Sequence, residues 1–330
     1  MPTGYRYRSK IPAVRERGTP TTDPQTANPL DIVPFRCQIG IMTEQAFHID
    51  RLPSRLRDPL LVAGFDGWGN ALDVSRAMAA YLIRKLEARP FARINPDLFY
   101  RYDKARPMVD IENGILEKVT PPGGTFFSAE TRPHGRGIVI LAAGEPHLRW
   151  TRFADRLLSL CEDLGVKTVI TLGSMYDNVL HSDRIISGIA SSNDLLSRLR
   201  EKNVIPVNYN GESAIHSTLL SEAQRRGIDC ISLWGHCPYY LEGTTHFGLL
   251  SALGDLLSSI GDFELDISGI EDRWRELNTQ IRQLIDKTPE FQKIIRKVRK
   301  AKVRGSWENI KDSLKKGDKV IPLKDFLDPD

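Results

Sequence analysis

Hydrophobic positions along the chain follow a regular alternation of two patterns from residue 59 onward. Short runs rich in leucine and β-branched residues end at turns, and helix-like segments with apolar residues every three or four positions follow them. The first pattern is typical of strands that are buried on both faces, and the second of amphipathic helices. The alternation therefore predicts a parallel sheet whose strands are connected by crossover helices.

Four principal strands and one short strand are expected in this region. The strands are predicted at residues 60–65, 138–142, 168–173 and 230–235, with the short one at 204–207. Asn70 should cap the first helix, because an asparagine side chain accepts hydrogen bonds from the first free N–H groups of a helix. Further helices are expected at about 148–164, 192–202, 213–227 and 245–260.

The segment 91–130 has shorter apolar runs, which are separated by prolines and glycines. The runs at 98–100, 115–119 and 125–127 predict strands that extend the sheet with antiparallel pairing at one edge. A short strand is also expected at 37–42.

The two ends of the chain differ from this central part, and three regions are predicted. Residues 1–30 are rich in proline and basic side chains, so they are expected to form a disordered tail. Residues 31–267 should form the α/β core, and residues 268–330 a C-terminal helical extension with a tail. In the extension Trp274, Leu277 and Ile281 form an apolar stripe, and Pro289 should start a second helix.

Composition narrows the class of protein. The chain has 330 residues, of which 41% are hydrophobic and 27% charged, which is enough apolar material for a large core. It has no uncharged apolar stretch near the roughly 18 residues that a membrane span needs, and no signal peptide is recognisable. We therefore expect a cytoplasmic protein that does not enter the membrane. The net charge of +4 is too small to indicate nucleic acid by itself.

In an open parallel sheet, ligands bind where the carboxyl ends of the strands converge with loops and helix N-termini. The loops after the predicted strands therefore contain the candidate binding residues. These residues are Asp66, Trp68, Glu145, His147, His181, Arg184, His236 and Tyr239. His181, Arg184 and His236 could form an anion or acid–base cluster if the fold brought them together. Glu145 also has a structural interpretation, because it precedes Pro146 at a helix start where a carboxylate is stabilised by the helix dipole.

Motifs for cofactor, metal or nucleophile chemistry are missing from the sequence. The glycines at 64, 67 and 69 match neither dinucleotide-binding nor phosphate-binding spacing. The four cysteines are scattered, and the histidines show no metal-ligand spacing. Ser213 lacks the second glycine of a nucleophile elbow and is interpreted as a helix cap. We expect no cofactor, no metal and no catalytic residue.

The most strongly charged segment is 293–304, which contains no acidic residue. Its candidate basic interaction face comprises Lys293, Arg296, Lys297, Arg299 and Lys300. Such a face attracts anionic surfaces, but it is also what a solvated helix presents. Because no aromatic residues are interleaved for base stacking, the segment argues against recognition of nucleic acid.

At the predicted loops the sequence resembles the proteasome assembly chaperone superfamily, in its second-subunit type of archaea and bacteria. The motifs run in order through Gly64–Phe65–Asp66–Gly67–Trp68–Gly69, Arg106–Pro107, Gly144–Glu145–Pro146 with Trp150, Leu172–Gly173–Ser174, Tyr209–x–Gly211, and Ser232–Leu233–Trp234 before Pro238–Tyr239. The resemblance implies a three-layer α/β/α fold that is similar to phosphorylases and hydrolases. It also implies homo-oligomers and protein partners.

Two departures limit what the resemblance implies for single residues. Family members often have Pro–His–Tyr at Pro238–Tyr239–Tyr240, and Thr–Arg near Asp183–Arg184. The chain ends in Leu327–Asp328–Pro329–Asp330 and not in a hydrophobic–tyrosine–any tail, so insertion of such a tail into a proteasome ring is not expected.

Three classes of function stay open from the sequence, and the third is a binder of anionic surfaces or RNA through Lys293–Arg304, whose binding would fall steeply with salt. The favoured one is a non-catalytic, assembly-chaperone-like protein that binds protein partners through the sheet-end loops and the extension. The alternative is a nucleoside phosphorylase-like or hydrolase-like enzyme that uses His181, Arg184 and His236 in the crevice.

Overall fold

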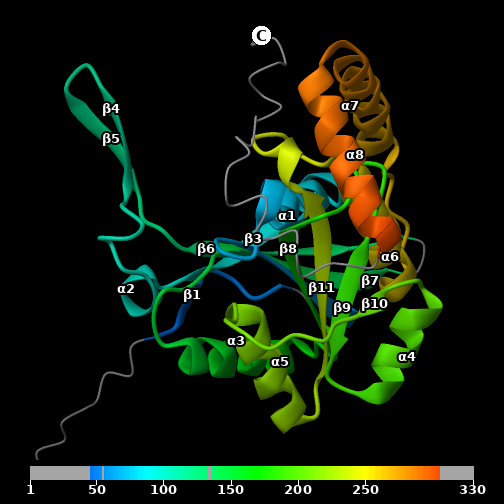
Figure 1. The fold of residues 1–330 in the computed structure, drawn as a ribbon. Helices are drawn as coiled ribbons and strands as arrows, with labels where there is room; N and C mark the ends of the chain where they lie inside the picture. Colours follow the sequence, from blue (N-terminus) through cyan, green and yellow to red (C-terminus); the bar gives the residue numbers. More distant parts are fainter. Residues whose placement is uncertain (1–44, 54–55, 133–134, 305–330) are drawn as a thin grey trace, which may run out of the picture. The chain divides into compact units, whose positions relative to one another are not determined.

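Strands and helices alternate in the structure as the hydrophobic pattern predicts (Figure 1). The computed structural model describes residues 45–53, 56–132 and 135–304. The strands are β1 (Phe47–Ile49), β2 (Arg57–Asp66), β3 (Arg89–Ile94), β4 (Met108–Glu112), β5 (Ile115–Thr120), β6 (Gly124–Glu130), β7 (Arg136–Gly144), β8 (Thr168–Asp177), β9 (Ile186–Ala190), β10 (Ile205–Pro206) and β11 (Asp229–Pro238). The predicted strand at 37–42 and the predicted tail at 1–30 lie outside the described residues.

One mixed sheet organises the described residues. Nine strands pair in the order β1-β3-β6-β7-β2-β8-β11-β9-β10. The central strands β7, β2, β8 and β11 are parallel to one another, as the four long apolar runs predict. At one side β6, β3 and β1 continue the sheet with antiparallel pairing.

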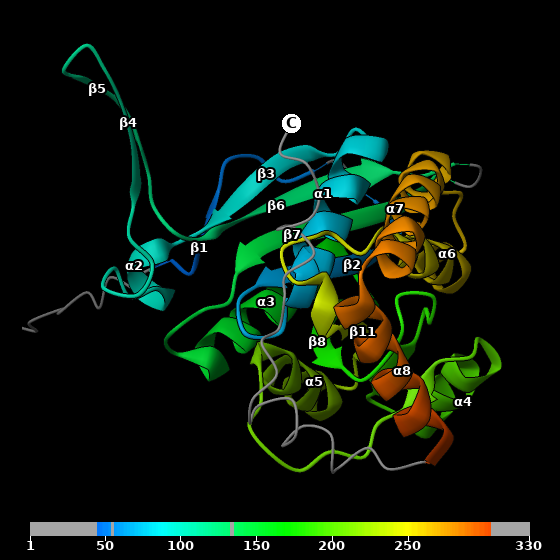
Figure 2. The ribbon, with the colours of Figure 1, turned by 45° about the horizontal axis from the view of Figure 1, so that its top comes forward.

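Helices cover both faces of this sheet. They are α1 (Val74–Lys85), α2 (Pro96–Phe99), α3 (Trp150–Leu164), α4 (Asn193–Glu201), α5 (Ile215–Arg226), α6 (Phe247–Gly261), α7 (Ser268–Lys287) and α8 (Pro289–Arg304), with short 3-10 turns η1 (Ala71–Asp73) and η2 (Tyr239–Leu241). Side chains alternate between the faces along a strand, so Leu60 and Val62 pack with α1 and α6, whereas Leu61 and Ala63 pack with α3 and α5. Figure 2 shows the two helical layers on opposite sides of the sheet. The predicted three-layer α/β/α fold is confirmed.

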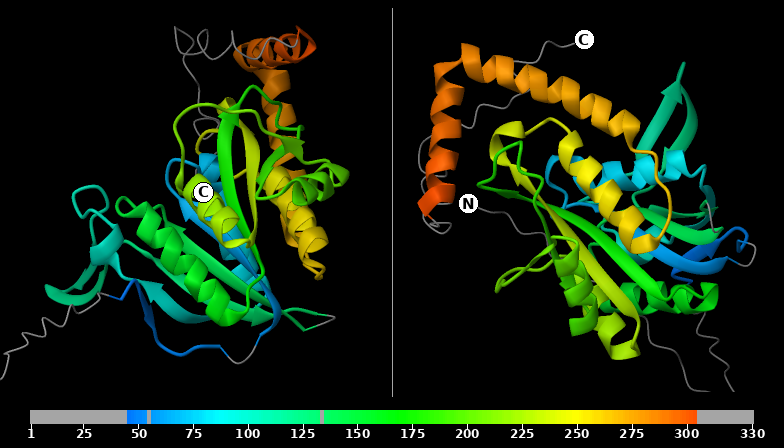
Figure 3. Two further views of the ribbon diagram at one scale, coloured as in Figure 1. Left: turned by 90° about the horizontal axis from the view of Figure 1, so that it is seen from below. Right: turned by 90° about the vertical axis from the view of Figure 1, so that its right-hand side faces the viewer.

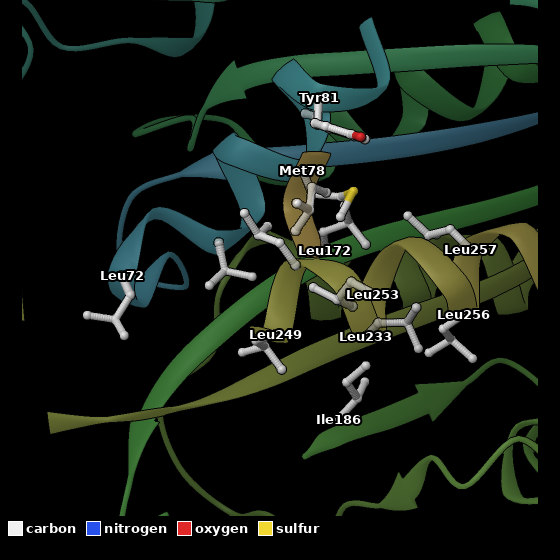
Figure 4. Close-up of a cluster of buried hydrophobic side chains, with 14 of the residues drawn as sticks. Leu72, Met78, Tyr81, Leu172, Ile186, Leu233, Leu249, Leu253, Leu256 and Leu257 are labelled. Carbon is white, nitrogen blue, oxygen red and sulfur yellow. The ribbon is translucent and has the colours of Figure 1, made fainter. Parts of the chain in front are cut away.

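The larger core lies between the sheet and the layer of α1 and α6. Figure 4 shows Leu172 of β8 and Leu233 of β11 facing Met78 of α1 and Leu253 of α6. All four side chains are completely buried. Burying such side chains contributes about 1.5–3 kcal/mol each, so this layer fixes the central strands against their helices.

The two C-terminal helices pack on the same core through the predicted stripe. Trp274, Leu277 and Ile281 of α7 are buried in it, together with Phe291 of α8. Pro289 is the first residue of α8, and Figure 3 shows that the chain changes direction sharply there. A proline cannot donate an N–H to the preceding helix, which explains the break. The boundary between a core at 31–267 and an extension at 268–330 stays a prediction.

Residues 91–130 differ from the expectation in two places. The run at 98–100 does not form a strand, because Asn95 caps and Pro96 starts the short helix α2 there. The run at 115–119 lies in β5, which pairs with β4 as a separate two-stranded hairpin and not with the main sheet. The antiparallel extension itself is formed by β3 and β6.

Two predicted helix caps have different outcomes. Asn70 lies before the N-cap residue of α1, which is Asp73, but its Oδ1 accepts the backbone N–H of Ser75 in the first turn of that helix at 2.9 Å. Ser213 does not cap α5, since its hydroxyl donates to the carbonyl oxygen of Ala214 and the N-cap residue is Ala214. A carboxylate from another loop replaces it, as described below.

Candidate functional site

The four parallel strands end side by side at one edge of the sheet. We call the segments around and after these strand ends, residues 66–70, 144–149, 177–184 and 236–241, the rim. All of the sequence-predicted crevice residues lie in these segments. They do not form a single cluster, however, and each has its own hydrogen-bond partners.

Glu145 connects two segments of the rim to the start of α5. Its Oε1 accepts the backbone N–H of Ile215 at 2.8 Å, and its Oε2 lies 3.4 Å from the backbone nitrogen of Trp68, which donates to it. Ile215 is the first residue of α5, so the carboxylate caps that helix and not α3, which the sequence had suggested. Gly67 allows this close approach, because a Cβ there would lie 2.9 Å from the Cβ of Glu145. Glu145 is therefore an organising residue of the rim.

Asp66 also has a structural partner. The Nδ2 of Asn70 donates to Asp66 Oδ1 and to Asp73 Oδ1, each at 3.0 Å. The same asparagine accepts the Ser75 N–H with its oxygen, as described above. Asp66 thus holds the turn between β2 and α1.

An aromatic cluster occupies the rim between β2, β8 and β11. Trp68 is 61% exposed, and its ring meets the edge of Trp234 with centroids 6.5 Å apart. The ring of His216 lies beneath at 4.9 Å from that of Trp234. Trp234 fits there because Gly69 and Gly173 have no side chains, since a Cβ on either would come within about 3 Å of its ring.

His216 is buried below this cluster and is neutral at pH 7. Its Nε2 donates to the carbonyl oxygen of Leu172 at 2.9 Å, whereas its Nδ1 has no partner in the described part of the chain. Burial lowers the pKa of His216 to about 4. Neither Trp234 nor His216 was singled out as a site residue from the sequence. The glycine at 173 was the available signal for Trp234, because parallel pairing of β8 and β11 places the two residues opposite each other.

His147 fastens α2 to the rim. Its Nδ1 accepts the backbone N–H of Arg101 at 3.2 Å, and its ring contacts the edge of Tyr100. The Tyr100 hydroxyl in turn donates to the carbonyl oxygen of Gly144 at 2.7 Å. Burial raises the pKa of this phenol well above its usual value, so Tyr100 remains protonated. His147 therefore holds the residues that follow α2 against the rim.

His181 and Arg184 lie near the C-terminal helices, where both contact Trp274. The backbone N–H of His181 donates to the hydroxyl oxygen of Tyr240 at 2.6 Å, and that hydroxyl donates to His181 Nδ1 at 2.9 Å. Burial lowers the pKa of His181 to about 4. Arg184 forms an ion pair of 3.1 Å with Glu271, and its guanidinium lies 5.6 Å from the centre of the Trp274 ring.

His236 belongs to a different network, which spans three strands. Its Nδ1 donates to Asp177 Oδ2 at 2.7 Å, and its Nε2 lies 2.8 Å from the hydroxyl of Ser187, which donates to it. The neighbouring Tyr239 stacks on Tyr176 with ring centroids 5.2 Å apart. The structure thus brings His181 and Arg184 together at Trp274, whereas His236 bonds to Asp177 and Ser187.

The basic face on α8 is present as an exposed surface. Lys293, Arg296, Lys297 and Arg299 are exposed on α8, whereas the side chain of Lys300 is outside the described part. Phe291, Ile295 and Val298 are buried on the other side of the helix. The helix is therefore amphipathic, with its cations on the exposed side and its apolar residues packed against the core.

The described ranges contain neither a cluster of side chains that could hold a metal ion nor a helix that could span a membrane. No three His, Cys, Asp or Glu side chains of residues 45–53, 56–132 and 135–304 gather closely enough to hold a metal ion. Among the same residues, no helix combines the length and the apolar character that crossing a bilayer requires.

Comparisons with known proteins identify a matching family and similar folds. A family model described as the PAC2 family matches residues 61–285. A PAC2 family protein from Streptomyces avermitilis is 26% identical with a TM-score of 0.65, covering 72% of this chain and 100% of the other. A proteasome-assembly chaperone homologue from Mycobacterium tuberculosis is 25% identical with a TM-score of 0.65, covering 72% and 99%.

A more distant structure supports the fold. The Pyrococcus furiosus protein PbaB, an archaeal proteasome activator, is 18% identical with a TM-score of 0.55, covering 72% of this chain and 97% of the other. No curated protein sequence matches the chain.

Proposed function

The chain belongs to the PAC2 family, and we propose that it acts as an assembly-chaperone-like protein that binds other proteins without catalysing a reaction. The sequence resemblance to proteasome assembly chaperones agrees with this family. Two similar proteins are a proteasome-assembly chaperone homologue and a proteasome activator. We further propose that the chain is cytoplasmic and homo-oligomeric, and that its partner is a subunit of a larger protein assembly.

The observation that carries the proposal is the exposed Trp68. Its ring stands on Trp234 at the rim, with its backbone held by Glu145. A large aromatic side chain that is exposed but rigidly mounted loses little conformational freedom on binding, so it is a typical anchor of protein interfaces. The exposed cations of α8 offer a second contact, which would suit an acidic partner surface.

Replacing Trp68 by alanine should remove partner binding and leave the fold intact. Affinity purification of the tagged full-length protein from its host, followed by quantitative mass spectrometry, should recover a reproducible set of proteins. We expect recovery to fall at least about tenfold in the variant, because truncated aromatic anchors typically cost 2 kcal/mol or more. The free energy of unfolding should change by less than about 1 kcal/mol, since the side chain is mostly exposed.

The matched control is Ile205→Ala, which removes an apolar side chain that is 50% exposed on β10, at the other edge of the sheet. This variant should recover the same proteins as the wild type. The proposal would be contradicted if Trp68→Ala and Ile205→Ala reduced the recovery of partner proteins equally. It would also be contradicted if the purification recovered only the chain itself and a small molecule.

One observation favours the alternative of a hydrolase. Asp177, His236 and Ser187 have the hydrogen-bond pattern of an acid–base–nucleophile triad. Ser187, however, is only 2% exposed and lies within β9, between β10 and β11. A substrate carbonyl cannot reach a hydroxyl that is covered in this way, and the flanking strands occupy the backbone N–H groups that would form an oxyanion hole. We propose that this triad ties the ends of three strands together.

A fluorophosphonate probe, which reacts with activated serines, should therefore not label the folded protein. We expect the wild type and Ser187→Ala to give the same background signal, while a serine hydrolase added to the same tube is labelled. Labelling of the wild type that disappears in Ser187→Ala would show that the serine is reactive and would support the hydrolase alternative.

A further inference from the structure

The β4–β5 hairpin projects from the rest of the protein. Figures 1 and 2 show it standing away from the sheet and from the helical layers. Its tip is Asn113–Gly114, with φ values of 50° and 82°. Two consecutive positive φ angles are what a tight hairpin turn requires, and Asn–Gly is the usual sequence for them. The turn chemistry therefore specifies this hairpin locally.

The pairing divides the hairpin into two unlike faces. Side chains that are directly opposite in an antiparallel pair lie on the same face. Val109 pairs with Val119, and Ile111 pairs with Leu116 beyond a register shift that leaves Glu117 as the extra residue of β5. The paired residues Val109, Ile111, Leu116 and Val119 share one face, which we call the apolar hairpin face. The opposite face is mixed, and its pairs are Met108 with Thr120, Asp110 with Lys118, and Glu112 with Ile115.

This apolar face has no cover within the described residues. The exposed fractions are 50% for Val109, 63% for Ile111, 57% for Leu116 and 51% for Val119. A two-stranded hairpin is at best marginally stable in water, and a contiguous apolar patch marks a contact surface. The hairpin therefore has the properties of an arm that is covered by another molecule.

A groove with apolar and basic lining residues lies on the same chain between α1, α6 and α7. It has a volume of about 490 Å³. Its apolar lining includes Tyr81, Phe247, Leu250 and Ile270. Figures 1 and 2 show α6 and α7 well separated from the hairpin, so a chain does not fill its own groove with its own arm.

The charges of the arm and of the groove have opposite signs. The hairpin carries Asp110, Glu112 and Glu117 against a single lysine, Lys118. The groove is flanked by Arg84, Lys85 and Arg273. Lys85 is paired with Asp266, whereas Arg84 and Arg273 form no ion pair within the described part of the chain. Because Asp110 and Glu112 lie on the face opposite to the apolar hairpin face, the opposite charges attract the arm as a whole toward the groove and do not by themselves fix its orientation.

We propose that the hairpin of one copy of this chain docks, by its apolar face, into the α1–α6–α7 groove of a second copy. The two surfaces of such a contact are different, so each copy offers one arm and one groove. A contact of this kind closes into a ring when its rotation permits. The inference gives a structural basis for the proposed homo-oligomer, and it does not depend on partner binding at the rim.

The first test compares Ile111→Thr/Leu116→Thr with Met108→Thr/Ile115→Thr on the opposite face. Both double variants exchange two exposed apolar side chains for a residue that favours strands, so the hairpin itself is preserved. Light scattering after size-exclusion chromatography should give a multiple of the 37.2 kDa chain mass for the wild type and the control. The apolar-face variant should show a dissociation constant at least about tenfold higher and approach the monomer mass on dilution.

The second test uses the groove. Arg84→Glu/Arg273→Glu should also dissociate the oligomer, and adding Glu112→Lys/Glu117→Lys to the same chain should restore it. A mixture of the apolar-face variant and the groove variant contains one intact arm and one intact groove, so it should form a dimer and no larger species.

A wild type that is monomeric at every concentration measured would overturn the inference. It would also be overturned if the apolar-face variant kept the wild-type mass, or if that variant dissociated while the groove variant did not. The last result would mean that the arm meets a surface other than the groove. Trp68→Ala should keep the wild-type mass, so failure of the rim proposal and failure of this one are distinguishable.

Discussion

Replacing Phe153 by alanine should lower the free energy of unfolding by about 3–5 kcal/mol, as is typical for a fully buried phenylalanine. Phe153 lies in α3 and is completely buried. Its ring makes edge contacts with Phe47, Phe65 and Phe99, at centroid distances of 6.1, 6.2 and 5.2 Å. These partners come from β1, β2 and α2, so a single ring joins three segments to the helix below the sheet.

The loss of stability in Phe153→Ala should be large because the cavity that the missing ring leaves cannot collapse easily. The neighbouring rings are mounted on strands that are themselves paired, and so the cavity would stay partly open. Urea unfolding followed by circular dichroism measures the effect, and Leu148→Ala, at an exposed position just before α3, is the control. A loss below about 1 kcal/mol for Phe153→Ala would show that the core on this face repacks freely.

The central strands were predictable from the sequence because local pattern and tertiary environment agree there. Leu61 and Val62 are buried on opposite faces, and such strands are apolar without interruption. The strand β9 was missed, since its residues include Ser187 and Gly188, which carry no strand signal. It is defined by its pairing with β11, and that pairing is a long-range property of the sheet.

The hairpin and α2 were wrongly assigned although their signals were present. Asn113–Gly114 between apolar residues is the strongest short-range hairpin signal, and it indicates that β4 and β5 pair with each other. Asn95 before Pro96 is a helix start, and it overrides the apolar run at 98–100 that suggested a strand. In both cases the prediction followed the hydrophobic run and gave too little weight to the turn and cap residues.

The candidate site was predictable as a set of loops but not as a set of contacts. Glu145, for example, was placed correctly at the rim, yet the helix that it caps begins 70 residues later in the chain. Likewise, the position of Trp234 on Gly173 depends on the register between β8 and β11. Register is set by how whole strands pack, so single motifs do not contain it.

Replacing Arg226 by methionine should destabilise the protein by about 3 kcal/mol, because it removes the partner of several carboxylates at a largely buried position. Arg226 ends α5, and only 12% of its side chain is exposed. Its Nε donates to Glu222 at 2.8 Å and its Nη1 to Glu162 at 3.2 Å, while its Nη2 contacts Asp155. It thereby connects α5, which Glu145 caps, to α3.

Arg225→Met is the matched control for this experiment. Arg225 contacts the same carboxylate, Glu222, but its side chain is 68% exposed. A solvent-exposed ion pair contributes about 0–1 kcal/mol, so this variant should retain nearly all of the wild-type stability in urea unfolding. Equal losses in the two variants would show that the position of the arginine between the helices is unimportant.

The pH dependence of stability tests the same contact without a large change in packing. Hydrogen bonds from Arg225 and Arg226 lower the pKa of Glu222 from 4.5 to about 2. A pKa that is lower in the folded than in the unfolded state stabilises the protein above the unfolded value, and this contribution is lost as the pH falls. The wild type should therefore lose stability between pH 4.5 and pH 2. Glu222→Gln should show a smaller loss over this interval, because its amide does not titrate, and an unchanged pH profile would exclude the Glu222 carboxylate as a source of the pH dependence.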